Sequence, residues 1–175
     1  MTDLTLRLAY PEEAYKVALL IRGAMLSYSK DSNIPKGMLE SLSESVESVA
    51  DRISHGRCLC FWDGPEPVAT VTLTVMANPV KYSFSDKTMS ALSDIAPAGY
   101  ISRFAVRSDL RDSGLGIKLL DAAENMARDI ELKGLFLHSS TDNKSLAKFY
   151  GNRGFAIIDH EHGRGYNRGL FIKKF

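Results

Sequence analysis

Several features that would assign a protein to a specialised class are scarce in this sequence. It has only two cysteines in 175 residues, and 22 lysines and arginines nearly balance 21 acidic residues, for a formal net charge of +1. Two cysteines cannot supply the disulfide framework of a small secreted domain. A net charge near zero provides no global field for nucleic acid or an anionic membrane, so any recognition of an anion must be local.

Long apolar runs are also missing, and residues 1–7 show no basic segment followed by an apolar leader. Cys58 and Cys60 lie one residue apart in an expected strand, where a mutual disulfide would be strained, so we expect buried thiols and a reducing compartment. The composition, with 45% hydrophobic and 25% charged residues, suits one compact domain over residues 1–175. We expect a cytoplasmic protein that binds neither nucleic acid nor membrane.

Hydrophobic periodicity predicts strands and helices that alternate along the chain. The strands are expected at 4–8, 57–62, 68–76, 100–106, 135–139, 155–158 and 168–175, and the helices at 11–25, 39–53, 116–132 and 144–152, with a short helix at 88–95 inside an irregular segment, 78–97. A turn at 63–66 predicts an antiparallel hairpin, whereas strand, helix and strand over 100–139 predict a parallel pair. The expected fold class is α/β (α+β), with a mixed, mostly antiparallel sheet of six to seven strands, a central parallel βαβ unit and helices on both faces.

The loop between the strand at 100–106 and the next helix is suited to holding a phosphate. Its sequence is Arg-Asp-Ser-Gly-Leu-Gly over residues 111–116. Gly114 and Gly116 keep side chains away from a ligand, so that backbone N–H groups at the helix N-terminus can face an anion, and Arg111 adds a charged fork. A diphosphate is the natural ligand. The alternative is that the two glycines only shape a tight turn, which leaves Arg111 unexplained.

A dinucleotide-binding Rossmann site is the main competing interpretation, because a Gly-Leu-Gly sequence follows a strand and opens a helix, and Asp142 follows the next strand. Leu119 occupies the position of the third glycine of that motif, and too little chain follows Asp142 to complete a doubly wound domain. The spacing of a Walker phosphate loop is absent as well.

A second motif is Asn-Lys-Ser-Leu-Ala-Lys-Phe-Tyr over residues 143–150, followed by Gly154 and Phe155. Together with the Arg111–Gly116 loop, in this order and on these elements, it resembles the GNAT superfamily of acyl-coenzyme A dependent N-acyltransferases. The family's loop pattern is Gln or Arg, two residues, Gly, one residue, then Gly or Ala, and its late helix carries Asn, Ala, Tyr and Gly-Phe. The resemblance covers nearly the whole chain.

The resemblance implies acetyl-CoA as co-substrate, no metal, and a set of cofactor-binding residues. The strand residues would pair with the pantetheine arm and the loop residues would hold the diphosphate, while the asparagine of the late helix would contact the cofactor or a bridging water. These residues are Phe104, Ala105, Val106, Arg111, Asp112, Ser113, Gly114, Leu115, Gly116, Ile117 and Asn143.

The resemblance also implies that Tyr150 donates a proton to the departing coenzyme A thiolate; the alternative is an ordinary core tyrosine. Some family members use a glutamate as general base near the strand 100–106, where this chain has Ser102 and Arg103. His138 is the candidate base on the next strand, with a packed strand histidine as the alternative. Positioning of an already neutral amine can also suffice.

Other polar and aromatic groups suggest weaker sites. His160 and His162 share one side of an expected strand, but two imidazoles without a third ligand do not define a zinc site, and residues 163–169 look like a hairpin turn. The cysteines are interpreted as core residues. Tyr28, Tyr82 and Phe84 are candidates for the wall of an acceptor pocket.

The predicted activity is therefore transfer of an acetyl group from acetyl-CoA to a primary amine of a small molecule or peptide by direct attack. Two alternatives stay open: a protein N-acetyltransferase, and an acyl-CoA sensor without turnover. An exposed sheet edge also leaves a homodimer open.

Overall fold

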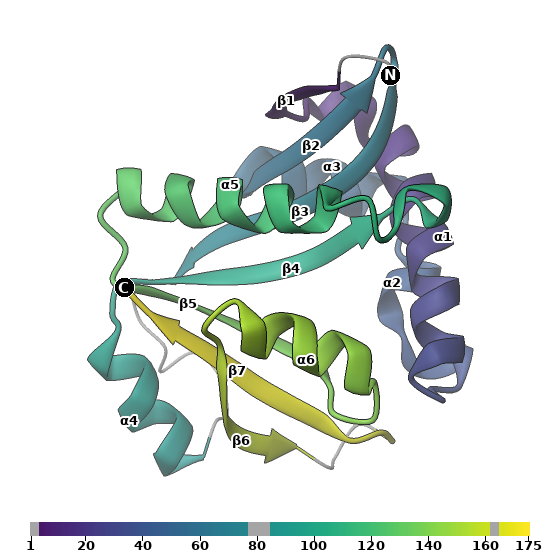
Figure 1. Ribbon diagram of the computed structural model, residues 1–175. Coiled ribbons are helices and arrows are strands. Elements are labelled where there is room, and N and C mark those ends of the chain that lie inside the picture. The colour runs from purple at the N-terminus through teal and green to yellow at the C-terminus, as the bar shows by residue number, and fades with distance from the viewer. Residues whose placement is uncertain (1–3, 77–84, 162–164) are drawn as a thin grey trace.

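The computed structural model describes residues 4–76, 85–161 and 165–175. Seven strands form one sheet in the order β1-β2-β3-β4-β5-β7-β6 (Figure 1). They are β1 Thr5–Leu8, β2 Arg57–Asp63, β3 Glu66–Met76, β4 Ala98–Val106, β5 Gly134–Ser140, β6 Ala156–Glu161 and β7 Arg168–Lys174. β4 and β5 run parallel, and the other described pairs are antiparallel. The expected mixed sheet and central parallel unit are confirmed.

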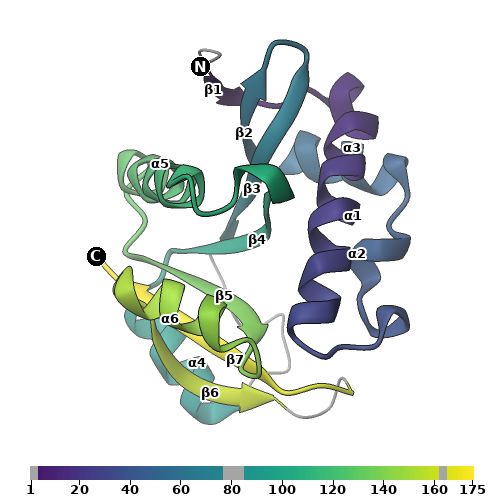
Figure 2. The ribbon, with the colours of Figure 1, turned by 45° about the vertical axis from the view of Figure 1, so that its right-hand side comes forward.

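Helices cover both faces of this sheet, as the views in Figures 1 and 2 agree. They are α1 Ala14–Asp31, α2 Glu40–Ser43, α3 Val46–His55, α4 Asp86–Asp94, α5 Leu115–Asp129 and α6 Lys144–Asn152. α5 buries Leu119, Leu120 and Ala123 against β3 in the largest hydrophobic cluster. On the other face, α1 and α3 pack on Cys58, Cys60 and Trp62 of β2, and α4 packs near Phe136 of β5.

The segment predicted as one helix over 39–53 is divided into two. α2 ends at Ser43 and α3 begins at Val46, because the Ser45 hydroxyl accepts a hydrogen bond from the Ser48 N–H at 3.1 Å and caps α3. A serine in extended conformation satisfies a backbone donor at the start of a helix and interrupts the preceding one. The predicted short helix also begins earlier, at Asp86, and residues 77–84, with Tyr82 and Phe84, lie outside the described part.

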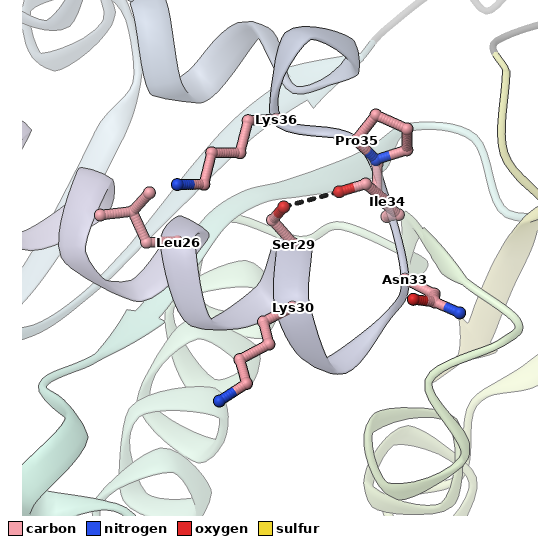
Figure 3. Close-up of a pocket in the computed structure, with 7 residues that line it drawn as sticks. All are labelled: Leu26, Ser29, Lys30, Asn33, Ile34, Pro35 and Lys36. Atoms are coloured by element: carbon pink, nitrogen blue, oxygen red, sulfur yellow. Dashed lines mark hydrogen bonds between the residues drawn. The ribbon is translucent and has the colours of Figure 1, made fainter.

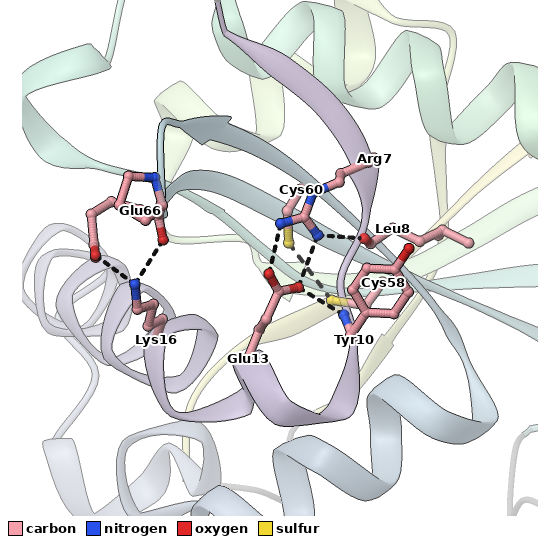
Figure 4. A network of polar contacts seen from close by, with 9 residues as sticks. Arg7, Leu8, Tyr10, Glu13, Lys16, Cys58, Cys60 and Glu66 are labelled. Carbon is pink, nitrogen blue, oxygen red and sulfur yellow. Dashed lines mark hydrogen bonds and ion pairs between the residues drawn. The ribbon is translucent and has the colours of Figure 1, made fainter.

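The first strand has its apolar side chains on the more exposed face, contrary to the expected pattern. Leu6 and Leu8 are 40% and 43% exposed, since β1 is an edge strand. Arg7 faces inward, with its guanidinium 4.0 Å from the centroid of the Trp62 ring. The same guanidinium donates two hydrogen bonds to the Glu13 carboxylate, with nitrogen–oxygen distances of 2.9 and 2.6 Å (Figure 4). One oxygen of Glu13 also accepts the Tyr10 N–H. This network ties β1 to the start of α1.

Because of this network, stability should fall in acid. The side-chain hydrogen bond from Arg7 lowers the pKa of Glu13, so its stabilising contribution is fully present above the ordinary carboxyl pKa and is lost as the pH falls through the lowered value. Glu13→Gln should cost up to about 1 kcal/mol at pH 7 and less below pH 4. Thermal unfolding of both proteins from pH 7 to 3 measures this, and a difference that does not shrink in acid would contradict it.

β4 and β5 separate soon after they meet, and this separation positions the site. They pair over Ala98, Gly99 and Tyr100 with residues 134–136, and then diverge toward Val106 and Ser140. β4 carries an irregularity opposite Thr70–Thr72, where Arg103 has a φ of +51°. A bulge bends a strand and redirects its side chains. Among the described residues, the diverging strands leave one edge of β4 without a neighbouring strand beyond Tyr100.

Candidate active site

A cavity of about 540 Å³ lies beside the end of β4 and the N-termini of α5 and α6, with α1 as its wall. It gathers most of the residues that were predicted to bind a cofactor: Phe104, Ala105, Val106, Arg111, Asp112, Gly114, Gly116, Ile117 and Asn143. Ser113 and Leu115 do not line it. Leu115 is buried in the main core, and the Ser113 hydroxyl donates to the Leu110 carbonyl at 2.6 Å. Both residues support the loop on the side away from the cavity.

The loop before α5 presents backbone donors to this cavity. Gly114 precedes the helix with a φ of +81°, a conformation in which only glycine is unstrained. The first helical hydrogen bond runs from the Lys118 N–H to the Gly114 carbonyl at 3.1 Å, so the N–H groups of Gly116 and Ile117 have no partner inside the helix. Open N–H groups at a helix N-terminus beside an arginine fit a diphosphate.

Arg111 already has an acidic neighbour, which the sequence did not suggest. Its guanidinium is 3.9 Å from the carboxylate of Asp31, at the end of α1, and both side chains are partly exposed. Asp31 also lines the cavity. An exposed pair at this distance is weakly held. Arg111 is therefore available to a more highly charged anion, and the negative charge of Asp31 would oppose the binding of that anion.

Asn143 is the capping residue of α6. Its side-chain oxygen accepts the Leu146 N–H at 3.0 Å, and its side-chain nitrogen donates to the Ser32 hydroxyl at 3.1 Å. Asn143 thereby holds the start of α6 against the end of α1 while facing the cavity. A contact to a cofactor has to coexist with these two structural bonds.

Tyr150 lies inside an aromatic cluster rather than on the cavity surface. The residue is 4% exposed, and its ring lies 5.3 to 6.3 Å from the rings of its neighbours. These are Phe104, Phe149, Phe155 and Phe171. Burial, and then the nearby Tyr28 hydroxyl, raise the pKa of Tyr150, so it stays protonated near neutral pH. Phe104 and Phe149, which pack on it, do line the cavity.

His138 lies on the other face of the sheet. Side chains alternate along β5, and Phe136 packs in the cluster beside α4 whereas Leu135 and Leu137 pack beside α5. His138 shares the face of Phe136, and its Nδ1 is 3.4 Å from the Tyr100 hydroxyl on β4. Its Nε2 is 3.8 Å from Glu161, which is also paired with Arg168. The sequence did not indicate the two partners of His138, because Tyr100 lies on β4 and Glu161 on β6.

Tyr28 connects α1 with β5. Its hydroxyl accepts the Ser140 N–H at 2.7 Å, and the side chain also lines the cavity. Burial raises the pKa of Tyr28, and hydrogen bonds from Ser140 and Ser139 oppose this shift. Tyr28 therefore lines the same cavity as the expected cofactor-binding residues, and its place in an acceptor pocket stays a prediction.

A second hollow of about 650 Å³ lies at the end of α1, where the chain turns toward α2 (Figure 3). Lys30 and Lys36 line it, and the Ser29 hydroxyl donates to the Ile34 carbonyl at 2.6 Å. This hydrogen bond fixes the turn after α1. The same hydrogen bond therefore helps to hold the end of α1, which carries Tyr28 and Asp31, in place.

The remaining candidate groups are the two cysteines and the histidines at the end of β6. Both cysteines are free and buried; their sulfur atoms are 4.0 Å apart, and that contact, with burial, raises the pKa of Cys60. Within residues 4–76, 85–161 and 165–175, no three metal-ligating side chains cluster; residues 162–164, with His162 and part of the expected hairpin turn, lie outside these ranges. In the same ranges, every helix is too short or too polar to span a membrane.

Comparison with known proteins points to the family that the two sequence motifs resemble. The sequence pattern of the Acetyltransferase (GNAT) family matches residues 27–155. A solved structure of PaiA N-acetyltransferase from Thermoplasma acidophilum in complex with coenzyme A is similar, with 15% identity, a TM-score of 0.77 and 99% of each chain covered. So is Arabidopsis thaliana NAA60 in complex with a bisubstrate analogue, with 14% identity, a TM-score of 0.73 and 98% of each chain covered.

A GCN5-related N-acetyltransferase structure from Rhodopseudomonas palustris shares 18% identity, with a TM-score of 0.74, over 100% of this chain and 98% of that one. No curated protein sequence matches this chain significantly. At these identities the solved structures show the shared fold, whereas the sequence pattern covers most of the chain, including the phosphate loop and the late helix. The protein therefore belongs to the GNAT family of acetyltransferases.

Proposed function

We propose that the protein transfers the acetyl group of acetyl-CoA to a primary amine of a small molecule or peptide, in the cytoplasm and without a metal. The observation that supports the proposal is that one cavity contains both the loop over residues 111–116 and the edge of β4 that no described strand pairs beyond Tyr100. The diphosphate would bind the N–H groups of Gly116 and Ile117 and the Arg111 guanidinium. The amides of pantetheine would add to the edge of β4 at Phe104–Val106 as an extra strand.

The reaction needs a neutral amine, a held thioester and a proton for the leaving sulfur. In the proposed reaction the amine nitrogen forms a bond to the thioester carbon, the carbon–sulfur bond breaks, and Tyr150 supplies the proton to sulfur. His138, oriented by the Tyr100 hydroxyl, would accept the proton that the nitrogen loses, from the face opposite α5 and α6. Tyr150 packs on the face covered by α5 and His138 lies on the face covered by α4, so the two groups would act from opposite sides of the sheet.

The alternative of an acyl-CoA sensor has one supporting observation. At the point on β4 where a carboxylate base is absent from the sequence, Arg103 is paired with Glu44 at 3.1 Å, and Glu44 also pairs with Arg52. A carboxylate engaged by two arginines is a poor base. Incubation with acetyl-CoA and a panel of amines and peptides separates the functions: product formation supports the enzyme, whereas tight binding without product supports the sensor.

Replacing Arg111 with alanine should weaken coenzyme A binding about tenfold. One charge-assisted hydrogen bond contributes about 1.5–3 kcal/mol, and the partial exposure of Arg111 places it at the low end. Isothermal titration calorimetry with coenzyme A measures the dissociation constant directly.

Two matched variants make this measurement specific. Arg107→Ala removes the same charge from the same segment, but Arg107 pairs with Asp109 and does not line the cavity, so binding should be unchanged. Asp31→Asn removes the competing carboxylate and should tighten binding a few-fold, since two exposed charges about 4 Å apart interact by about 1 kcal/mol in water. Equal affinities for Arg111→Ala and Arg107→Ala would place the diphosphate elsewhere.

A further inference from the structure

We infer that Tyr28 closes the inner end of the cofactor cavity and restricts the transferred acyl group to a short chain. This inference rests on the proposed function and deepens it, because it assigns acyl-chain selectivity to one residue of α1. It starts from the direction in which the cavity runs. Arg111 and Gly116 hold one end, the segment Phe104–Val106 forms the side, and Tyr28 stands where α1 meets the end of β5.

A cofactor anchored by its diphosphate must place its acyl group toward the other end of this cavity. The edge of β4 leads from the loop back toward the irregularity at Arg103, three residues beyond the last β4–β5 pair at Tyr100. Tyr28 reaches across to β5 at this level and takes the N–H of Ser140, which is itself fully buried.

The phenol of Tyr28 is held firmly, so it acts as a fixed wall. The end of α1 is fixed by the hydrogen bond from the Ser29 hydroxyl to the Ile34 carbonyl at 2.6 Å (Figure 3) and by the bond from Asn143 to the Ser32 hydroxyl at 3.1 Å. The Ser32 N–H also donates to the Tyr28 carbonyl at 2.9 Å. A long acyl chain that displaced the phenol would leave the buried Ser140 N–H without its acceptor, which is costly.

Binding of acyl-CoA thioesters of increasing length tests the inference without a known acceptor. Calorimetry with coenzyme A, acetyl-CoA, butyryl-CoA and octanoyl-CoA should show affinity that does not increase beyond acetyl in the wild-type protein and that falls at octanoyl. In Tyr28→Ala the wall is removed, and butyryl-CoA should bind more tightly than acetyl-CoA. Each methylene buried in the new space contributes up to about fourfold in affinity, from about 0.8 kcal/mol per CH₂.

Three other variants make the result specific to Tyr28. Tyr28→Phe keeps the ring and should keep the chain selectivity while lowering the melting temperature. Tyr28→Leu removes less volume and serves the same purpose as Tyr28→Ala if that variant does not fold. Tyr15→Ala removes an exposed tyrosine from the outer side of the same helix and should behave as wild type.

The outcomes separate the inference from the proposed function. If wild-type protein binds none of the four ligands, the proposed function fails, and the inference fails with it. If coenzyme A and acetyl-CoA bind, but octanoyl-CoA binds the wild type as well as acetyl-CoA does, Tyr28 does not restrict the chain. The same conclusion follows if the Tyr28→Ala or Tyr28→Leu variant keeps the wild-type order of affinities.

Discussion

Tyr150→Phe should lower kcat by about 10²- to 10⁴-fold while leaving coenzyme A affinity and folding intact. The Tyr150 hydroxyl has no hydrogen-bond partner among the described residues, although the residue is 4% exposed. The hydroxyl oxygen is not one of the fully buried, unpartnered polar atoms of the described residues, so phenylalanine should be tolerated with little change in melting temperature. Retention of a hydroxyl in such an aromatic cluster is expected where the group serves chemistry.

Steady-state kinetics with an acceptor from the amine panel, together with thermal unfolding, decide this prediction. Tyr15→Phe is the matched control, because it removes a hydroxyl from a side chain of a residue that is 60% exposed and should change neither quantity. If Tyr150→Phe leaves kcat unchanged, Tyr150 is a core aromatic residue and the proton comes from elsewhere. The raised pKa predicts that the wild-type donor stays protonated, so the fold loss should be similar from pH 6 to 9.

Local patterns in the sequence predicted the strands, most helices and the phosphate loop, because each depends on neighbours in the chain. The glycine loop before α5 and the parallel β4–β5 pair both follow from short motifs. The interruption at Ser45 was missed, since a serine inside an apolar period looks like a polar helix position until its side chain is seen to cap.

Contacts between distant segments account for what the sequence could not show. His138 was a candidate base from its position on a strand, but its neighbours Tyr100 and Glu161 come from other strands. Asp31 lies 80 positions from Arg111 in the chain, and only the packing of α1 beside the loop brings their charges together. The site is thus predictable as a loop and a helix, and its electrostatics depend on tertiary structure.

Gly134→Ala should destabilise the fold by about 2–3 kcal/mol, near the upper end of the usual range for overpacking. A Cβ atom at this position would lie 2.6 Å from the Lys173 carbonyl oxygen and 3.1 Å from Cβ of Ile95. The carbonyl belongs to the β7 backbone, which pairs with β5 along its whole length, so it cannot move without loss of that pairing. At about 2–4 °C per kcal/mol, the melting temperature should fall by roughly 5–10 °C.

Gly23→Ala provides the opposite result from the same type of substitution. Gly23 lies inside α1, and an alanine methyl group there would meet no atom of a neighbouring segment within 4 Å, so alanine should stabilise the helix by about 0.5–1 kcal/mol.

Gly134 begins the strand that pairs with β4 for three residues before the two strands diverge, so its substitution also strains the point from which β4 and β5 separate. Equal melting temperatures for Gly134→Ala and wild type would contradict the close approach of β5 and β7. If stability falls while coenzyme A affinity is kept, the site depends on the far ends of β4 and β5 rather than on their junction.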